Sequence, residues 1–437
     1  MTLRVHPGES PPMGFIVPFF LLAPLGLIVA GSVMLRTGPE TFVAINAGQT
    51  VAVTHALALG WVSTVMMGAC YQLGPVVLGG TLRSTRVIPV QLCIHIVAIG
   101  LFVASFAWLN VFWTGVAGSL LFVSIVLFLA NAGYALWTAP SWSVPRAYLV
   151  ASTAGLGLAA TFGLVFAGNL EHGWFAMSQG KLASHAHLGL AGWLALTLMG
   201  VSYQLVPMFN IASKVKTRFA YPALFVTAGA VLLFAGAMWT DPGREVRMLL
   251  TLLLIVGPAL WAVDQVRIIT GRAKRRMDIH GRATIVSLCF LGLTMVLGLG
   301  AAFGSPFVTD SEPARWPLAY ATAGLVGWAG TAIIANSFKI VPFLIWYHRY
   351  RPQMGKAAVP LIHDIYHEGA ALGLLVLHSV SAMVLTMAAL AGNLTLLHTG
   401  AVLLALSGAG HMASMLAMFL PKRSSRASTE VARETAS

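Results

Sequence analysis

Histidines are the residues of this chain with the greatest potential for chemistry. The sequence has 13 histidines and only 13 acidic residues, and charged residues make up 9% of its 437 positions. His185 and His187 lie two positions apart, and His55 lies in a similar stretch 132 residues before His187. Neutral imidazole is a common metal ligand and an axial ligand of heme iron. These three histidines are therefore the first candidates for a cofactor site.

A second group of candidates begins at position 363. The segment reads His-Asp-Ile-Tyr-His-Glu, and His378 follows it. On a helix, offsets of 4 and 11 place His363, His367 and His378 on one stripe. Two imidazoles and a carboxylate can hold copper, zinc or iron. The alternative is the first turn of a helix, in which the acids complement the helix dipole, His363 and His367 face water, and His378 faces inward.

Long apolar stretches must position these residues. The chain is 58% hydrophobic with a mean hydropathy of +0.82, which excludes a soluble enzyme and leaves no basic surface for nucleic acid. A membrane helix needs roughly 20 mainly apolar residues. About twelve such stretches are expected, near 14–35, 48–78, 88–109, 112–138, 148–168, 183–209, 219–239, 248–268, 283–303, 316–345, 365–391 and 396–419. The predicted fold is all-α, a polytopic membrane protein forming a single transmembrane domain over residues 1–437 in a lipid bilayer.

Basic residues are distributed unevenly between alternate loops. Of the 26 Lys and Arg, 20 fall in loops or tails on the side that holds both termini, and 5 fall on the other side. The positive-inside rule then predicts a multi-pass protein of the cell inner membrane with both termini in the cytoplasm. The net charge of +13 is chiefly an orientation signal. Residues 421–437 are expected to form a disordered cytoplasmic tail.

The chain also contains an internal repeat. Residues 55–75 read HALALGWVSTVMMGACYQLGP, and residues 187–207 read HLGLAGWLALTLMGVSYQLVP, with nine identical positions. A fainter third copy follows 135 residues later, with Thr322 in place of the histidine. The repeat predicts three pseudosymmetric four-helix units, at about 14–138, 148–268 and 283–419, with the motif helices on the inside. The alternative is that the shared Gly, Trp and Tyr only pack helices and anchor them at the membrane boundary.

Pseudosymmetry would place His55 and His187 at similar depth on neighbouring inner helices. That arrangement suits the two axial positions of a single heme iron. His185 points to nearly the opposite side of its helix from His187, so it is a candidate ligand of a second heme or metal. The alternative is that hydrogen bonds between helices satisfy these imidazoles. Lys339, which replaces the Gln of the repeat, is expected to snorkel toward the boundary, or else to serve a proton path or pair with a heme propionate.

At this point the residues resemble those of a known family. The segment from His185 to Trp193, continuing to Tyr203 and Pro207, resembles the helix of C-family heme-copper oxidase catalytic subunits that carries a His-x-His pair. That family has twelve spans with threefold pseudosymmetry. The opening Pro-Phe-Phe-Leu-Leu at residues 18–22, followed by a His-bearing second span, is similar to the NnrS family of heme- and copper-containing membrane proteins linked to nitric oxide stress.

The resemblance implies particular cofactors and ligands. It implies a b-type heme held by His55 and His187, with His185 on a second heme or copper. The chain departs from the oxidases because it has no adjacent His-His pair and because its His-x-His lies on the sixth span and not on the tenth. Reduction of dioxygen by the oxidase mechanism is therefore not expected.

Two classes of function follow. The first is a heme-binding membrane protein that transfers electrons or handles nitric oxide or another diatomic gas, with a cytochrome or respiratory complex as partner. The second is a non-heme copper transporter or an assembly factor for a respiratory complex. Transporters usually repeat as two halves, so three units of the same topology favour the first class.

Overall fold

The structure is a computed structural model that describes residues 10–42, 44–107, 111–212, 215–273, 276–303 and 314–421. These residues form helices and connecting loops, and no strand occurs among them. Twelve of the helical spans are long and apolar enough to cross a membrane. The all-α prediction is confirmed, and the protein is a multi-pass membrane protein surrounded by lipid. The predicted disordered tail lies, beyond residue 421, outside the described residues.

Nine spans form the outside of the bundle. At most 50% of the most apolar stretch of each is buried within the protein, so much of their surface is left for lipid. They are α1 (Met13–Leu22) continuing into α2 (Pro24–Met34), α5 (Val87–Ala107), α6 (Val111–Thr138), α7 (Val144–His172), α10 (Ala220–Met238), α11 (Arg244–Thr270), α12 (Ile279–Phe303), α15 (Glu368–Ala391) and α16 (Leu394–Ala417).

Three further spans lie inside, and they carry the repeated motif. Their most apolar stretches are 72%, 67% and 67% buried. Each is an α-helix that widens into a π-helical segment and then returns to α. The first is α3 (Gly48–His55), η3 (Ala56–Ser63) and α4 (Thr64–Leu78); the second is α8 (Gln179–His187), η4 (Leu188–Ala195) and α9 (Leu196–Asn210); the third is α13 (Arg315–Thr322), η5 (Ala323–Ala329) and α14 (Gly330–Ile345).

The π-helical segments are the centre of the fold. They begin directly after His55, His187 and Thr322, which are the equivalent positions of the three repeats. All three segments contact one another. A π-helical turn rotates the side chains beyond it relative to an α-helix, and such turns are frequent at functional sites. The sequence analysis did not foresee them, because hydropathy does not distinguish a π-turn from an α-turn.

Glycines let the outer helices approach these inner segments closely. A Cβ on Gly26 of α2 would lie 2.6 Å from the carbonyl oxygen of Ala56, and a Cβ on Gly155 of α7 would collide with the backbone of Gly192. Neither contact tolerates a side chain, since backbone atoms cannot move aside. Helix association in a membrane depends on such close packing.

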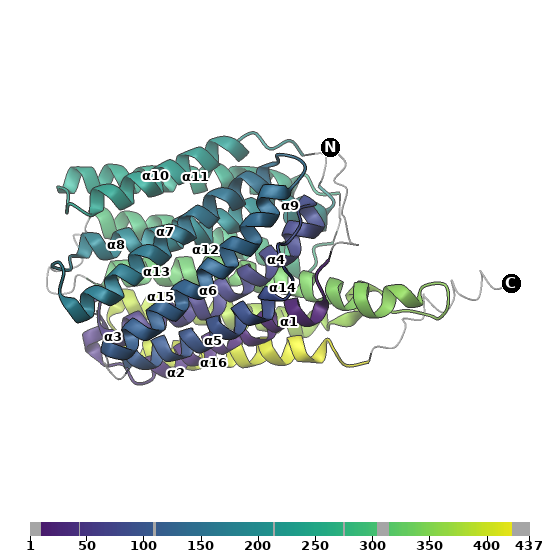
Figure 1. The fold of residues 1–437 in the computed structure, drawn as a ribbon, viewed down its shortest axis with the longest axis horizontal. Helices are drawn as coiled ribbons and strands as arrows, with labels where there is room; N and C mark the ends of the chain where they lie inside the picture. Colours follow the sequence, from purple (N-terminus) through teal and green to yellow (C-terminus); the bar gives the residue numbers. More distant parts are fainter. Residues whose placement is uncertain are drawn as a thin grey trace.

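The two faces of the bundle differ. Helix α1 begins and α16 ends at the same face (Figure 1), here called the terminal face. At this face α14 continues through η6 (Trp346–Tyr350) and η7 (Arg351–Gln353) beyond the other helices. The other end, at which α3, α8 and α13 begin, is here called the opposite face. All three candidate heme-ligating histidines lie in the half of the bundle nearer to the opposite face.

Candidate cofactor site

His55 and His185 face each other between the first and second inner spans. Their ring centroids are 6.2 Å apart and their planes are inclined by 18°. Phe102 of α5 packs on His55 with a centroid distance of 4.8 Å, and Phe166 of α7 packs on His185 at 5.6 Å. Both histidines are only half-buried although they lie within the bundle, which indicates space beside them. We call this contact between inner spans the first seam.

His187 and Tyr320 form a second pair, between the second and third inner spans. Their ring centroids are 5.9 Å apart at 17°, and the Tyr320 hydroxyl lies 3.4 Å from His187 Nε2. Phe234 of α10 packs on His187 at 4.3 Å, as Phe102 does on His55. We call this contact the second seam. Its geometry repeats that of the first seam almost unchanged.

Hydrogen bonds fix the tautomer of two of these histidines. Nδ1 of His55 lies 2.8 Å from the carbonyl oxygen of Val51, and Nδ1 of His187 lies 2.8 Å from that of Ala183. A carbonyl oxygen can only accept, so each Nδ1 carries the proton. Each Nε2 is left with its lone pair, which is the state in which imidazole binds a metal. At His185, Nδ1 is buried and no hydrogen bond to it meets the geometric criteria among the described residues.

The pairing differs from the one expected from the sequence, which placed His55 and His187 on one iron. Among the described residues, no ring contact joins them. The reason is the pseudosymmetry itself: equivalent residues point in the same direction relative to their own unit, so each faces the next unit and not its own equivalent. His55 therefore meets His185, and His187 meets Tyr320, which occupies the position of His185 in the third repeat.

A third seam closes the ring of inner spans, and it carries no such pair. The position equivalent to His55 is Thr322, and the position equivalent to His185 is Val53 in the first repeat. Neither residue has a ring that could ligate a metal. Ring pairs between inner spans of this kind are therefore found at two of the three seams.

The second predicted metal group is not assembled. His363 and His367 are exposed and His378 is fully buried, and no cluster of three or more metal-ligating side chains occurs among the described residues. The three histidines do not share one helical stripe, because α15 begins only at Glu368. His367 is its N-cap, accepting a hydrogen bond at Nδ1 from the amide of Ala370.

His378 instead has two partners within the bundle. Its Nε2 donates to the carbonyl oxygen of Val326 at 2.9 Å, and its Nδ1 lies 3.0 Å from the Ser407 hydroxyl. The Val326 carbonyl belongs to η5, whose widened turns leave backbone oxygens available. His378 thus stabilises the inner span and has no free lone pair for a metal. His363 and His367 face water, as in the alternative, but only His367 belongs to the start of α15, and His363 lies in the preceding 3-10 turn η8 (Ile362–Ile365).

Lys339 forms an ion pair, which neither sequence-based alternative anticipated. Its ammonium contacts Asp278 Oδ2, and it lies 5.7 Å from the centre of the Phe209 ring. The two charged side chains are 18% and 14% exposed. Asp278 also accepts a hydrogen bond from the amide of Gly281 at the start of α12. The pair joins the third inner span to an outer helix near the terminal face.

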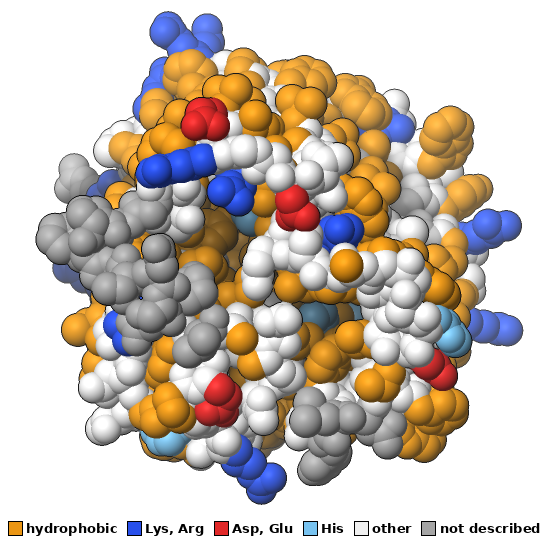
Figure 2. Space-filling model, turned by 90° about the vertical axis from the view of Figure 1, so that its left-hand side faces the viewer, with side chains coloured by type: hydrophobic (Ala, Val, Ile, Leu, Met, Phe, Trp, Pro, Cys, Tyr) orange, Lys and Arg blue, Asp and Glu red, His pale blue; other side chains and the backbone are white. Residues whose placement is uncertain are grey.

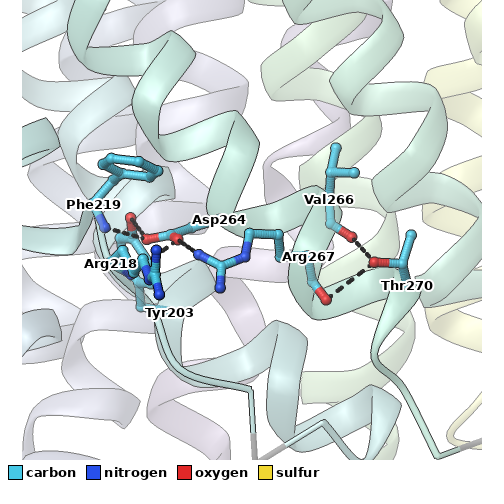
Figure 3. A network of polar contacts seen from close by, with 7 residues as sticks. All are labelled: Tyr203, Arg218, Phe219, Asp264, Val266, Arg267 and Thr270. Carbon is cyan, nitrogen blue, oxygen red and sulfur yellow. Dashed lines mark hydrogen bonds and ion pairs between the residues drawn. The ribbon is translucent and has the colours of Figure 1, made fainter.

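Asp264 is a buried acid that sequence reasoning missed (Figure 3). Its carboxylate accepts hydrogen bonds from the amides of Arg218 and Phe219 and from the Tyr203 hydroxyl, and Arg267 lies 3.6 Å away. This network fastens the loop between α9 and α10 to α11. The presence of a lone Asp in an apolar stretch was the only signal for it in the sequence.

Comparisons with known proteins do not identify the chain. No family model matches it, and no curated protein matches it.

Proposed function

We propose that the protein is a heme-binding electron carrier of the membrane, with His55 and His185 as the two axial ligands of one b-type heme. The observation that carries this proposal is the spacing of their imidazoles across the first seam. Iron bound to two imidazole nitrogens at ~2 Å, with each ring centroid ~1.1 Å beyond its nitrogen, separates the centroids by roughly 6 Å. The two rings are 6.2 Å apart and their planes are inclined by 18°, a separation that one metal ion between them would span.

The surroundings of the pair also suit a porphyrin. Phe102 and Phe166 supply aromatic walls beside the ligands. Gly163 of α7 faces the His185 ring, and a Cβ there would lie 3.2 Å from Cε1. The half-buried state of both histidines is consistent with a group that fills the adjoining space.

Each residue has a distinct role in this proposal. His55 is held by the Val51 carbonyl, which orients its ring and directs the lone pair of Nε2 away from its own helix. His185 supplies the ligand from the second unit. The phenylalanines exclude water, which lowers the local dielectric and so influences the reduction potential. A heme held by His55 and His185 would supply one-electron transfer.

The depth of the site favours an electron partner at the opposite face. His55 lies seven residues from the start of α3 and 23 residues from the end of α4. At about 1.5 Å per residue these lengths are about 11 Å and about 35 Å. We propose that a soluble cytochrome or a respiratory complex exchanges electrons there, with both termini in the cytoplasm as the distribution of basic residues predicts.

The test is an absorption spectrum of the purified full-length protein with metal and heme quantification. We expect a red protein with one low-spin bis-histidine heme per chain. His55→Ala and His185→Ala should each abolish that signal. His172→Ala is the control, because His172 is exposed and packs on Trp174.

Two results would contradict the proposal. A colourless protein without iron, purified from heme-replete cells, would refute heme binding. Copper bound in place of heme, and lost in the same variants, would instead support the copper transporter or assembly factor.

A further inference from the structure

A cavity of about 1040 Å³ lies at the second seam, lined by residues of α8, η4, α10, α11, α12, α13 and η5. It reaches from Arg244, the first residue of α11, to Pro258. These residues are 14 positions apart, so the cavity is about 21 Å deep at 1.5 Å per residue. Its mouth is at the opposite face, where Figure 2 shows a hollow with hydrophobic walls beside basic side chains. Volumes of this order are typical of sites for small organic ligands and cofactors.

Two arginines lie at the mouth of the cavity. Arg244 and Arg247 lie three residues apart, on the same side of α11, and both line it. Neither has an acidic partner within 4.0 Å among the described residues. Arg244 donates a hydrogen bond to the carbonyl oxygen of Phe303, which holds it at the rim. Asp241 is the only acidic residue among the described residues that line the cavity, and it accepts a hydrogen bond from the Ser178 hydroxyl.

Below the mouth the walls are apolar, with one polar pair. The side chains of α11 and α12 that line it include Leu254, Ile255 and Leu291. His187 and Tyr320 also line the cavity, and the hydrogen bond between them is long, at 3.4 Å. His187 Nε2 is therefore available to a ligand that enters this far.

We propose that this cavity binds an anionic amphiphile, with its acidic group on Arg244 and Arg247 and its apolar body extending to His187. Arginine pairs with carboxylate and phosphate through charge-assisted hydrogen bonds, and an apolar cavity of this depth excludes a fully polar ligand. Two sources share this chemistry: a tetrapyrrole with its propionates, and a lipid or fatty acid. The site is separate from the first seam, so it does not depend on the heme proposed there.

The experiment identifies co-purified ligands by native mass spectrometry and then measures binding of two probes, oleate and heme, to delipidated full-length protein. The variants are Arg247→Gln and the double variant R244Q/R247Q. We expect the double variant to bind its probe about tenfold more weakly, since two charge-assisted contacts are lost at a partly exposed site. Lys181→Gln is the control, because Lys181 lies over Trp239 near the same face and does not line the cavity.

His187→Ala distinguishes the two sources. If the ligand is a tetrapyrrole, the His55→Ala variant keeps a heme signal from this cavity, and His187→Ala removes that signal. If the ligand is a fatty acid, His187→Ala binds oleate as tightly as the parent protein. Leu254→Trp is a second variant that fills the cavity without altering its charge, and it should abolish binding of either probe. Failure of both probes to bind, or binding that neither R244Q/R247Q nor Leu254→Trp weakens, would overturn the proposal.

Discussion

The imidazoles of His55 and His185 lie 6.2 Å apart with nearly parallel planes, although the residues belong to different repeat units. The pair is formed where the first inner span meets the second, just before the π-helical segment of each span. His187 and Tyr320 repeat this relationship at the next seam with a centroid distance of 5.9 Å. The same arrangement of two nearly parallel rings therefore occurs at both seams. The second ring is that of His185 at the first seam and that of Tyr320 at the second.

The first prediction separates the two ways of pairing the histidines. His185→Ala should abolish the bis-histidine heme spectrum, whereas His187→Ala should leave it in place, because His187 faces Tyr320 and not His55. Absorption and electron paramagnetic resonance spectra of the two purified variants measure this. Loss of the low-spin signal in His187→Ala, with retention in His185→Ala, would restore the pairing expected from the sequence.

The second prediction concerns the space beside His185. Gly163→Ala should reduce heme occupancy or shift the reduction potential, because the new methyl group would lie 3.2 Å from His185 Cε1 and displace the ring. Gly157→Ala, on the same helix, is the matched control, since its Cβ would meet only Leu129 at an ordinary 3.5 Å. A redox titration of both variants compares them. If the two variants have the same heme occupancy and the same reduction potential, His185 does not bind the heme iron.

The third prediction concerns the ion pair near the terminal face. Lys339→Met should lower the free energy of unfolding by about 2 kcal/mol, because it removes a charge-assisted contact to Asp278 in a poorly solvated position. In Lys339→Met/Asp278→Asn the loss should be smaller than the sum of the two single losses. Thermal unfolding in detergent measures the cycle, with the exposed Lys356→Met as control. If the loss of stability in the double variant equals the sum of the two single losses, Lys339 and Asp278 do not stabilise the protein through each other.

The fourth prediction is a pH dependence at Tyr366, which lies just outside the eleventh span. Burial, with smaller contributions from the negative charges of Asp278 and Glu368, raises the pKa of its hydroxyl to about 12. An unfolded tyrosine ionises near pH 10, so the stabilisation is complete below about pH 10 and is lost as the pH rises through 12. Tyr366→Phe should therefore lose less stability between pH 10 and pH 12 than the parent. Identical alkaline unfolding curves would contradict this.

The sequence by itself determined the spans and the repeat. Twelve apolar stretches were recognisable because the membrane imposes a length and a hydropathy that local composition reveals. Most predicted boundaries agree with the helices to within about five residues. The repeat identified His55 and His187 as equivalent positions, and the structure starts a π-helical segment after each of them.

Only the tertiary structure decided which side chains meet. Two residues at equivalent positions of a repeat have similar surroundings, but they do not have to face each other. The rotation that relates one unit to the next places His185, and not His187, opposite His55. The partner of Lys339 lies 61 residues away, and local patterns carry no information about contacts of that range. His367 became an N-cap because α15 starts one residue later, at Glu368. The cavity beside His187 is formed by residues of five different spans, so no single stretch of sequence could reveal it.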